Sequence, residues 1–377
     1  MQYRKFGNTG VNISALGFGC MRLPEIQQED GSWIVDQEKV DAMMRLAYEK
    51  GVNYFDTAPY YCHKNSEEAI GKALKPFRDK IYVSTKCPLD VVKKTEDLEA
   101  MLDKSLAKLD MDYVDFYHFW GIDRKEFDEI IMPLNLLEEA QRLKSIGKIR
   151  HISFSFHDTP DALKHIIDNG PQLESVLLQY NLLDRTNEEM MHYAAEKGLG
   201  VVVMGPVGGG RLAAPTELAQ KLGTGNFNTY ELALRFVLGH PAVCCALSGM
   251  GDLDMVEKNT AVGALEVPMT EEQWRQAGES MENLKKFSEL YCTGCAYCQP
   301  CPKGIEIPKI FQAYTYYNVY GLKDTAKNAW NRYVNNEQKP GVTSDACVGC
   351  GFCESKCPQK LQIRDLLKKV EPVLKSL

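Results

Sequence analysis

Eight short apolar segments, each followed by a segment of helical periodicity, predict a (β/α)8 TIM barrel over the first two thirds of the chain. Beyond residue 263 the pattern turns polar, and two cysteine-rich runs follow residue 290. These observations predict an α/β protein in which the barrel is followed by a smaller, mainly helical domain.

The barrel prediction depends on the order of the segments. A hairpin is expected first, because residues 3–6 and 11–15 flank Gly7-Asn8-Thr9-Gly10. Strands in a parallel sheet are covered on both faces and therefore appear as continuous apolar runs. Such runs predict strands at 16–20, 52–56, 81–86, 113–119, 149–155, 175–180, 200–204 and 243–248. Helical patterns occupy 37–50, 66–75, 95–109, 134–146, 159–169, 187–197, 228–238 and 252–262.

A doubly wound sheet is the alternative architecture for alternating strands and helices. When it binds a dinucleotide, it carries a G-x-G-x-x-G motif after its first strand. The first predicted strand, Leu16-Gly17-Phe18-Gly19-Cys20, does not supply that motif. The count of eight units and a length of about 250 residues favour the barrel.

The cysteines of the C-terminal region have a distinctive spacing. Residues 347–358 follow C-x2-C-x2-C-x3-C-P, the run that holds a 4Fe-4S cluster in bacterial ferredoxins, where the fourth cysteine ligates the other of two clusters. A second run, which ends before Pro302, differs only in a last gap of two residues. We therefore expect one cluster on Cys292, Cys295, Cys298 and Cys357, and another on Cys347, Cys350, Cys353 and Cys301.

Two other uses of these cysteines are less consistent with the spacing. Zinc motifs usually come as separated C-x2-C pairs, whereas these are uninterrupted runs of four, each closed by proline. Disulfides belong to secreted proteins, and nothing here indicates secretion. A helical pattern at 308–334 between the runs favours an α-helical ferredoxin-like domain with two 4Fe-4S clusters. The predicted domains are a barrel at 1–265, a bridging helix at 266–290 and the cluster domain at 291–377.

Composition narrows the class of function. The chain has 377 residues, 44% hydrophobic and 25% charged, with a net charge of −7. This balance is ordinary for a soluble globular protein and does not indicate a nucleic-acid partner. The first residues lack the apolar core of a signal peptide, and no apolar run is long enough to span a bilayer. We expect a cytoplasmic protein that does not bind membranes or nucleic acid and acts on a small-molecule substrate.

Three polar residues are expected to meet at the mouth of the barrel. Active sites of TIM barrels lie at the C-terminal ends of the strands, where Asp56 and Lys86 stand, and Tyr61 follows Asp56 closely. A lysine beside a phenol favours the phenolate and lowers its pKa, while an aspartate holds the lysine. The tyrosine then protonates an oxygen as hydride reaches the carbonyl carbon. In the alternative reading Asp56 caps a loop, Tyr61 packs and Lys86 is solvated.

Three short strings resemble the aldo-keto reductase family. They are Gly51-Val52-Asn53-Tyr54-Phe55-Asp56, Thr57-Ala58-Pro59-Tyr60-Tyr61 and Ser84-Thr85-Lys86, and the resemblance covers residues 1 to about 263. With its tail, the chain resembles the iron–sulfur members that carry a C-terminal dicluster domain. The resemblance implies a Tyr–Lys–Asp–His tetrad and a nicotinamide cofactor, usually NADP(H), bound without a Rossmann fold. Tyr61 is then the acid, Lys86 tunes it and Asp56 holds Lys86.

The sequence departs from the family pattern at several positions. Trp120 stands where the family has its histidine, and His118 lies two residues earlier on the same strand face. His118 is therefore either catalytic or a packed core histidine. The cation that would hold a 2′-phosphate is replaced by Met255, which leaves NADP and NAD both open. The residues expected at the cofactor are Ser155, Gln179, Met204, Gly208, Gly209, Arg211, Gly249, Glu257 and Asn259.

The clusters and the nicotinamide pose a problem of electron count. A nicotinamide moves two electrons together as hydride, whereas each cluster moves one. A flavin in the barrel or a redox partner protein would reconcile the two. The expected function is an iron–sulfur oxidoreductase that reduces a carbonyl or related substrate. The alternatives are an electron-transfer module whose barrel has lost its catalytic function, or a conventional reductase whose clusters are structural.

Overall fold

The computed structural model describes residues 1–182, 184–210, 212, 227–283, 290, 292, 294–318, 323–336 and 338–377. The chain forms two compact units. The first comprises Met1–Asn181, Arg185–Pro206 and Ala233–Glu271, and the second comprises Leu182–Asp184, Val207–Leu232 and Glu272–Leu377.

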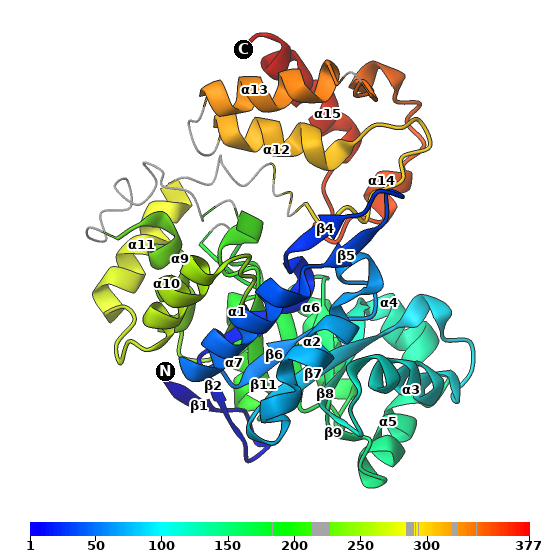
Figure 1. Cartoon of the computed structure of the whole chain (residues 1–377), viewed down its shortest axis with the longest axis vertical. Coiled ribbons are helices and arrows are strands. Elements are labelled where there is room, and N and C mark those ends of the chain that lie inside the picture. The colour runs from blue at the N-terminus through cyan, green and yellow to red at the C-terminus, as the bar shows by residue number, and fades with distance from the viewer. Residues whose placement is uncertain are drawn as a thin grey trace. The chain divides into compact units, whose positions relative to one another are not determined.

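Eight parallel strands close into a barrel in the first unit, which confirms the predicted fold (Figure 1). Around the barrel the order is β10-β11-β12-β3-β6-β7-β8-β9, so strands that follow one another in this series are hydrogen-bonded neighbours. The strands are β3 (Leu16–Gly19), β6 (Tyr54–Asp56), β7 (Tyr82–Pro88), β8 (Val114–Ile122), β9 (Ile149–Phe156), β10 (Ser175–Gln179), β11 (Gly200–Met204) and β12 (Cys245–Ser248).

The helices that alternate with these strands begin and end within two residues of the predicted limits. Side chains cap the N-termini of two of them, because Asp36 and Thr159 accept hydrogen bonds from the first turns that follow. The helices are α1 (Gln37–Glu49), α2 (Ser66–Leu74), α3 (Asp97–Leu109), α5 (Leu136–Ser145), α6 (Pro160–Asn169), α7 (Glu188–Glu196), α9 (Thr229–Gly239) and α10 (Leu253–Gly263).

The N-terminal end of the barrel is closed by the predicted hairpin, β1 (Tyr3–Lys5) and β2 (Asn12–Ser14). Its Phe6 is fully buried and meets the Phe116 ring edge-on, with 4.8 Å between centroids. Gly200 makes room for Phe6, because a Cβ at that position would lie 2.6 Å from the Phe6 ring. With this end filled by side chains, the opposite end of the strands is left for a site.

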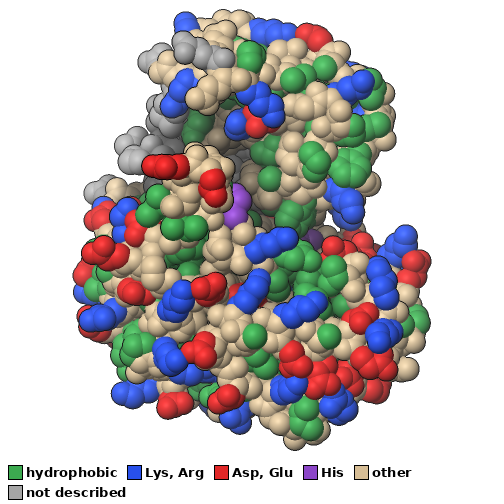
Figure 2. Space-filling model, turned by 45° about the vertical axis from the view of Figure 1, so that its right-hand side comes forward, with side chains coloured by type: hydrophobic (Ala, Val, Ile, Leu, Met, Phe, Trp, Pro, Cys, Tyr) green, Lys and Arg blue, Asp and Glu red, His purple; other side chains and the backbone are tan. Residues whose placement is uncertain are grey.

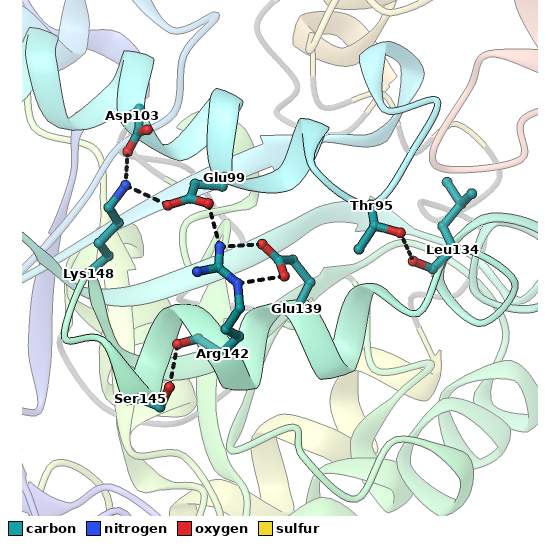
Figure 3. A network of polar contacts seen from close by, with 8 residues as sticks. All are labelled: Thr95, Glu99, Asp103, Leu134, Glu139, Arg142, Ser145 and Lys148. Atoms are coloured by element: carbon teal, nitrogen blue, oxygen red, sulfur yellow. Dashed lines mark hydrogen bonds and ion pairs between the residues drawn. The ribbon is translucent and has the colours of Figure 1, made fainter.

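On the face of the barrel unit shown in Figure 2, charged side chains of both signs are mixed. One network joins α3 to α5 (Figure 3): Lys148 bridges Glu99 and Asp103 at 2.7 and 2.6 Å, and Arg142 contacts both Glu139 and Glu99. These groups are partly or largely exposed, so solvent screens them and they contribute little to stability.

Two features of the barrel were not predicted. A hairpin of β4 (Glu25–Gln27) and β5 (Trp33–Val35) follows β3, and α4 (Arg124–Glu126) continues into a π-helical turn, Phe127–Ile131. The β4–β5 strands are short and mostly exposed, so they lack the apolar alternation that marks a half-buried strand.

The second unit is helical in its C-terminal part, as predicted. The predicted helical segment 308–334 contains two helices, α12 (Ile307–Asn318) and α13 (Lys323–Val334). Both α12 and α13 pack against α15 (Ile363–Lys375) around a core that includes Phe311, Trp330 and Leu367. The described residues also form α11 (Glu271–Asn283) and α14 (Phe352–Ser355). Among the described residues, no helix has the length and apolar character needed to cross a membrane.

Candidate active site and cluster sites

Lys86 and Asp56 form a buried ion pair at the C-terminal ends of adjacent strands. The pairing of β6 with β7 sets Asp56 opposite Ser84 and places Lys86 two residues further along. Lys86 Nζ donates hydrogen bonds to Asp56 Oδ2 at 2.6 Å and to the Thr57 carbonyl at 2.8 Å. Ser84 Oγ donates to Asp56 Oδ1 at 2.7 Å. Since the two charged side chains are only 2% and 4% exposed, each depends on the other to offset the cost of burial.

Tyr61 lies directly above this pair. Lys86 Nζ is 4.8 Å from the centre of the Tyr61 ring. Burial first, and the Asp56 charge second, raise the pKa of Tyr61 well above its ordinary value. This direction is opposite to the lowering expected from the sequence, because burial disfavours the charged phenolate. The Lys86 ammonium itself donates to Asp56 and Thr57. The phenol is therefore protonated at neutral pH, as a proton donor must be.

His118 and Trp120 occupy different surroundings on β8. His118 is fully buried beside Lys86 in strand register, and its Nε2 lies 3.8 Å from Asp56 Oδ1, beyond hydrogen-bonding distance. Burial and then the Lys86 charge lower the pKa of His118 well below its ordinary value, so the imidazole is neutral. Trp120 instead meets Tyr61 edge-on, with 5.7 Å between ring centroids.

Three residues predicted at the nicotinamide stand at neighbouring strand ends. Gln179 and Met204 pair in register at the ends of β10 and β11. Ser155, near the end of β9, accepts a hydrogen bond from the Gly121 backbone N–H at 2.7 Å. Gly205 has a φ of 63°, and a Cβ there would approach the Gln179 amide to 2.7 Å. Glycine is thus needed beside Gln179, which fixes where its side-chain amide lies.

The residues predicted to contact the adenine of the cofactor form ion pairs and hydrogen bonds with other residues of the protein. Glu257, on α10, forms an ion pair with Lys50 at 2.7 Å, and both side chains are about half exposed. Asn259 donates to Ser248 Oγ at 2.9 Å. Asp252 caps α10 by accepting from the Met255 backbone N–H at 2.8 Å. Gly249 follows β12 directly.

The proposed pyrophosphate loop falls in the second unit. Gly208, Gly209 and Gly210 form a 3₁₀ turn with φ values of 60°, 67° and 95°, a conformation that favours glycine. Arg211, the fourth residue of this prediction, lies outside the described residues.

The cluster domain contains two cavities, each lined by four cysteines. They are the two sets predicted from the crossed pairing of the runs. One cavity is lined by Cys301, Cys347, Cys350 and Cys353. The other is lined by Cys292, Cys295, Cys298 and Cys357. In both, four cysteine thiols line one space, and four cysteines are the ligand set of a 4Fe-4S cluster.

Side chains outside the motifs shape the two cavities differently. The first is also lined by Lys303 and Arg364, and Arg364 donates to the Gly349 carbonyl at 3.1 Å and to Glu354 at 2.7 Å. The second is lined by apolar residues, among them Phe311. Sequence reasoning missed Arg364, and likewise Ser84 and Thr57 at the active site. Only Ser84 had a signal, since it shares a face of β7 with Lys86.

Comparison with known proteins supports the assignment of both the barrel and the cluster domain. The family model "Aldo/keto reductase family" matches residues 15–282, and "4Fe-4S dicluster domain" matches residues 291–361. The chain therefore belongs to the aldo/keto reductase family of oxidoreductases. It is an enzyme of that class whose C-terminal domain is of the iron–sulfur dicluster type.

Individual relatives match about 70% of the chain. L-galactose dehydrogenase from Arabidopsis thaliana is 30% identical over 289 residues, which cover 69% of this chain and 88% of that protein. The uncharacterized oxidoreductase YqkF of Bacillus subtilis is 26% identical over 293 residues, covering 69% and 90%. Among solved structures, an aldo-keto reductase from Bacillus halodurans in its holo form is 28% identical, with a TM-score of 0.64, covering 74% of this chain and 96% of that one.

Proposed function

We propose that the chain reduces a carbonyl, or a related unsaturated group, of a small-molecule substrate at Tyr61, Lys86 and Asp56. The observation that carries this proposal is the buried Lys86–Asp56 pair beneath the Tyr61 ring. A buried ion pair is weak evidence for stability alone, because burying two charges is costly. Its place at the C-terminal strand ends, with Lys86 Nζ 4.8 Å from the centre of the Tyr61 ring, supports a chemical role.

Tyr61 supplies the proton in this reaction. As the carbonyl π bond breaks, the substrate oxygen gains negative charge and takes the proton of the Tyr61 hydroxyl, which solvent then restores. Lys86, held by Asp56 and Thr57, places a fixed positive charge beside this oxygen and the phenolate left behind. His118 completes the proposed set as a neutral group near Asp56.

A nicotinamide is the proposed cofactor. When bound, it supplies the hydride that forms the new C–H bond. Ser155, Gln179 and Met204 would hold its carboxamide and ring. The rest of the proposed binding set is Gly208, Gly209, Arg211, Gly249, Glu257 and Asn259. Exposed Met255 stands where a cation would hold a 2′-phosphate, and the nearby Asp254 is paired with Lys258, so the proposal covers both NADP and NAD.

Two 4Fe-4S clusters would be held by the eight cysteines of the cluster domain. They supply single electrons, so exchange with a two-electron cofactor requires a flavin or a redox partner protein. For the domains, the proposed limits are 1–265, 266–290 and 291–377. A reducing cytoplasmic setting suits the thiolate ligands.

Replacement of Tyr61 by phenylalanine tests the proposal. We expect Tyr61→Phe to lower kcat for reduction of a reactive aromatic aldehyde, such as 4-nitrobenzaldehyde, by about 10²- to 10⁴-fold. The matched control is Tyr82→Phe, which removes a phenol at the other end of β7 and should leave turnover unchanged. Full turnover by Tyr61→Phe would refute the proton-donor role.

A second candidate function is an electron-transfer module whose barrel binds no nicotinamide. It is favoured by the ion pair between Glu257 and Lys50, which engages a residue expected at the adenine. A titration with NADH and NADPH separates the two functions. The protein is prepared anaerobically and loaded with iron, and binding is monitored by protein fluorescence. Saturable binding of either supports the reductase, and absence of binding by both supports the module.

A further inference from the structure

The backbone that follows Tyr61 adopts an unusual conformation. Three consecutive non-glycine residues, Cys62, His63 and Lys64, have φ values of 50°, 51° and 75°. For residues with a Cβ this left-handed region is unfavourable, because the Cβ lies too close to the following carbonyl oxygen. Such strain persists only where surrounding contacts impose it, and it gathers at functional sites. We call residues 61–66 the Tyr61 turn.

Tyr61 itself is part of this turn through its backbone. Its carbonyl oxygen accepts hydrogen bonds from the Lys64 N–H at 2.9 Å and from the Ser66 N–H at 3.3 Å. If the left-handed residues relaxed, both bonds would be lost and the Tyr61 backbone would rotate. The direction of the Tyr61 side chain over Lys86 thus depends on the conformation of residues 62–64.

Buried contacts hold the inner side of the turn. The Cys62 thiol points at the carbonyl oxygens of Cys20 and Met21, at 3.5 Å from each. Ser66 Oγ donates to the Cys20 carbonyl at 2.9 Å. These contacts anchor Cys62 and Ser66, on either side of His63, to the segment after β3, and His63 lies on the exposed side.

The β4–β5 hairpin holds the outer side. His63 Nδ1 lies 2.7 Å from Glu25 Oε1, on β4. The His63 ring stacks on Trp33, on β5, with 5.7 Å between centroids and 10° between planes. Asn65 Nδ2 donates to the Trp33 carbonyl at 2.9 Å. The hairpin therefore contacts two residues of the turn by three kinds of interaction.

We propose that His63 is a positioning residue, which with Glu25 and Trp33 of the β4–β5 hairpin keeps the Tyr61 turn left-handed and so fixes Tyr61 over Lys86. This inference rests on the proposed function of Tyr61. It also gives a role to the one hairpin of the barrel unit that lies outside both the closed barrel and its N-terminal plug.

The solvent exposure of His63 and Glu25 separates a role in positioning Tyr61 from a role in the global stability of the protein. The His63 and Glu25 side chains are 57% and 21% exposed. Ion pairs of this kind contribute little to global stability, since solvent screens them. Loss of His63 should therefore leave the unfolding transition almost unchanged and alter the local population of the turn.

Three variants at two positions test the inference. His63→Ala removes the contacts and keeps the strain, whereas His63→Gly removes both. Trp33→Phe preserves an aromatic face for stacking. We expect His63→Ala to lower kcat for the aldehyde about tenfold or more with an unchanged KM for the nicotinamide, since misplacing a catalytic group by about 1 Å can cost about a hundredfold. His63→Gly should lose less activity than His63→Ala, and Trp33→Phe should stay near wild type.

A matched control exists on α6. His165 also pairs with a carboxylate, Asp128, at 2.7 Å and meets an aromatic ring, that of Phe127. His165→Ala therefore removes a similar set of contacts away from the turn and should leave kcat unchanged. In a Tyr61→Phe background, His63→Ala should cause no further loss, because its effect passes through Tyr61.

Hydrogen exchange gives a readout that needs no substrate. We expect His63→Ala to accelerate amide exchange in a peptide covering residues 61–66, and His165→Ala to leave it unchanged. Unaltered exchange and unaltered kcat in His63→Ala would overturn the inference. The two proposals fail separately: full turnover by Tyr61→Phe refutes the proposed function, whereas an inactive Tyr61→Phe with a fully active His63→Ala refutes only the positioning role.

Discussion

Lys86 donates a 2.6 Å hydrogen bond to Asp56, and the two side chains are almost completely buried. The pair spans the ends of β6 and β7, so each charge comes from a different strand of the closed barrel. Inside the protein the charges cannot be solvated by water, and the free energy of the folded state depends on both being present.

Removal of one charge from this pair should lower the free energy of unfolding more than removal of both charges. We expect Asp56→Asn to lower the free energy of unfolding by about 3–5 kcal/mol, because it leaves the Lys86 ammonium buried without a carboxylate. The double variant Asp56→Asn/Lys86→Met should lose less than Asp56→Asn alone. Urea denaturation of the iron-loaded protein, monitored by tryptophan fluorescence, measures the free energy of unfolding of both variants.

An exposed pair serves as the control for this comparison. Lys39 and Asp36 lie 2.8 Å apart at the start of α1, and the Lys39 side chain is 68% exposed. Lys39→Met should leave the unfolding midpoint close to that of the wild type. A double variant no more stable than Asp56→Asn would contradict the account of the buried pair.

The architecture was predictable because a strand that is buried on both faces of a sheet consists of consecutive apolar residues, which the sequence shows directly. The strand predicted at 200–204 is β11 at those residues, and the other barrel strands differ by at most three residues at either end. The β4–β5 hairpin carries no such signal, since its strands are three residues long and mostly exposed. Its importance lies in contacts with a distant segment, which composition does not reveal.

The sequence allowed the residues of the active site to be predicted, but it did not allow their geometry to be predicted. Strand ends identified Asp56 and Lys86, and a family resemblance identified Tyr61. The expected direction of the Tyr61 pKa shift was wrong, because burial of the phenol and the nearby Asp56 charge both raise its pKa. The left-handed backbone at Cys62 and Lys64 was not predictable either, because of the three residue types in this stretch only histidine is enriched in that region.

His240 should make the barrel sensitive to acid. It is fully buried at the end of α9, and its ring lies 4.6 Å from that of His192. Burial first, and then His192, lower the pKa of His240 to about 4, while the nearby Glu188 opposes this and Arg185 adds to it. Tyr180 also packs against the His240 ring, edge to face.

The sign of the pH dependence follows from proton binding. The unfolded chain protonates His240 near pH 6.5, whereas the folded protein resists protonation down to about 4. Stability is therefore lost as pH falls from 6.5 toward 4, by up to about 3 kcal/mol from this group. His240→Asn preserves an acceptor for the Ala242 N–H and should flatten the pH dependence of the urea midpoint over this range. An unchanged slope in His240→Asn would show that other groups cause the acid sensitivity.

The crossed ligation of the two clusters can be tested by pairs of cysteine variants. In the crossed arrangement Cys292 and Cys357 line one cavity, while Cys301 lines the other. Cys292→Ala/Cys357→Ala should then remove one cluster and leave about four irons per chain. Cys292→Ala/Cys301→Ala should damage both clusters, although its two substitutions lie in a single run.

Ligation within each run predicts the reverse outcome for the two double variants, because Cys292 and Cys301 would then share a cluster. Iron analysis of anaerobically purified protein, together with electron paramagnetic resonance after reduction, distinguishes the arrangements without any enzyme assay. Cys244→Ala is the control, since this half-buried cysteine lies outside both cavities and should leave the iron content unchanged. The crossed arrangement joins the start and the end of the cluster domain through two shared cofactors. Loss of Cys357 near its C-terminus should therefore disturb the cluster held mainly by the first run, more than forty residues earlier in the sequence.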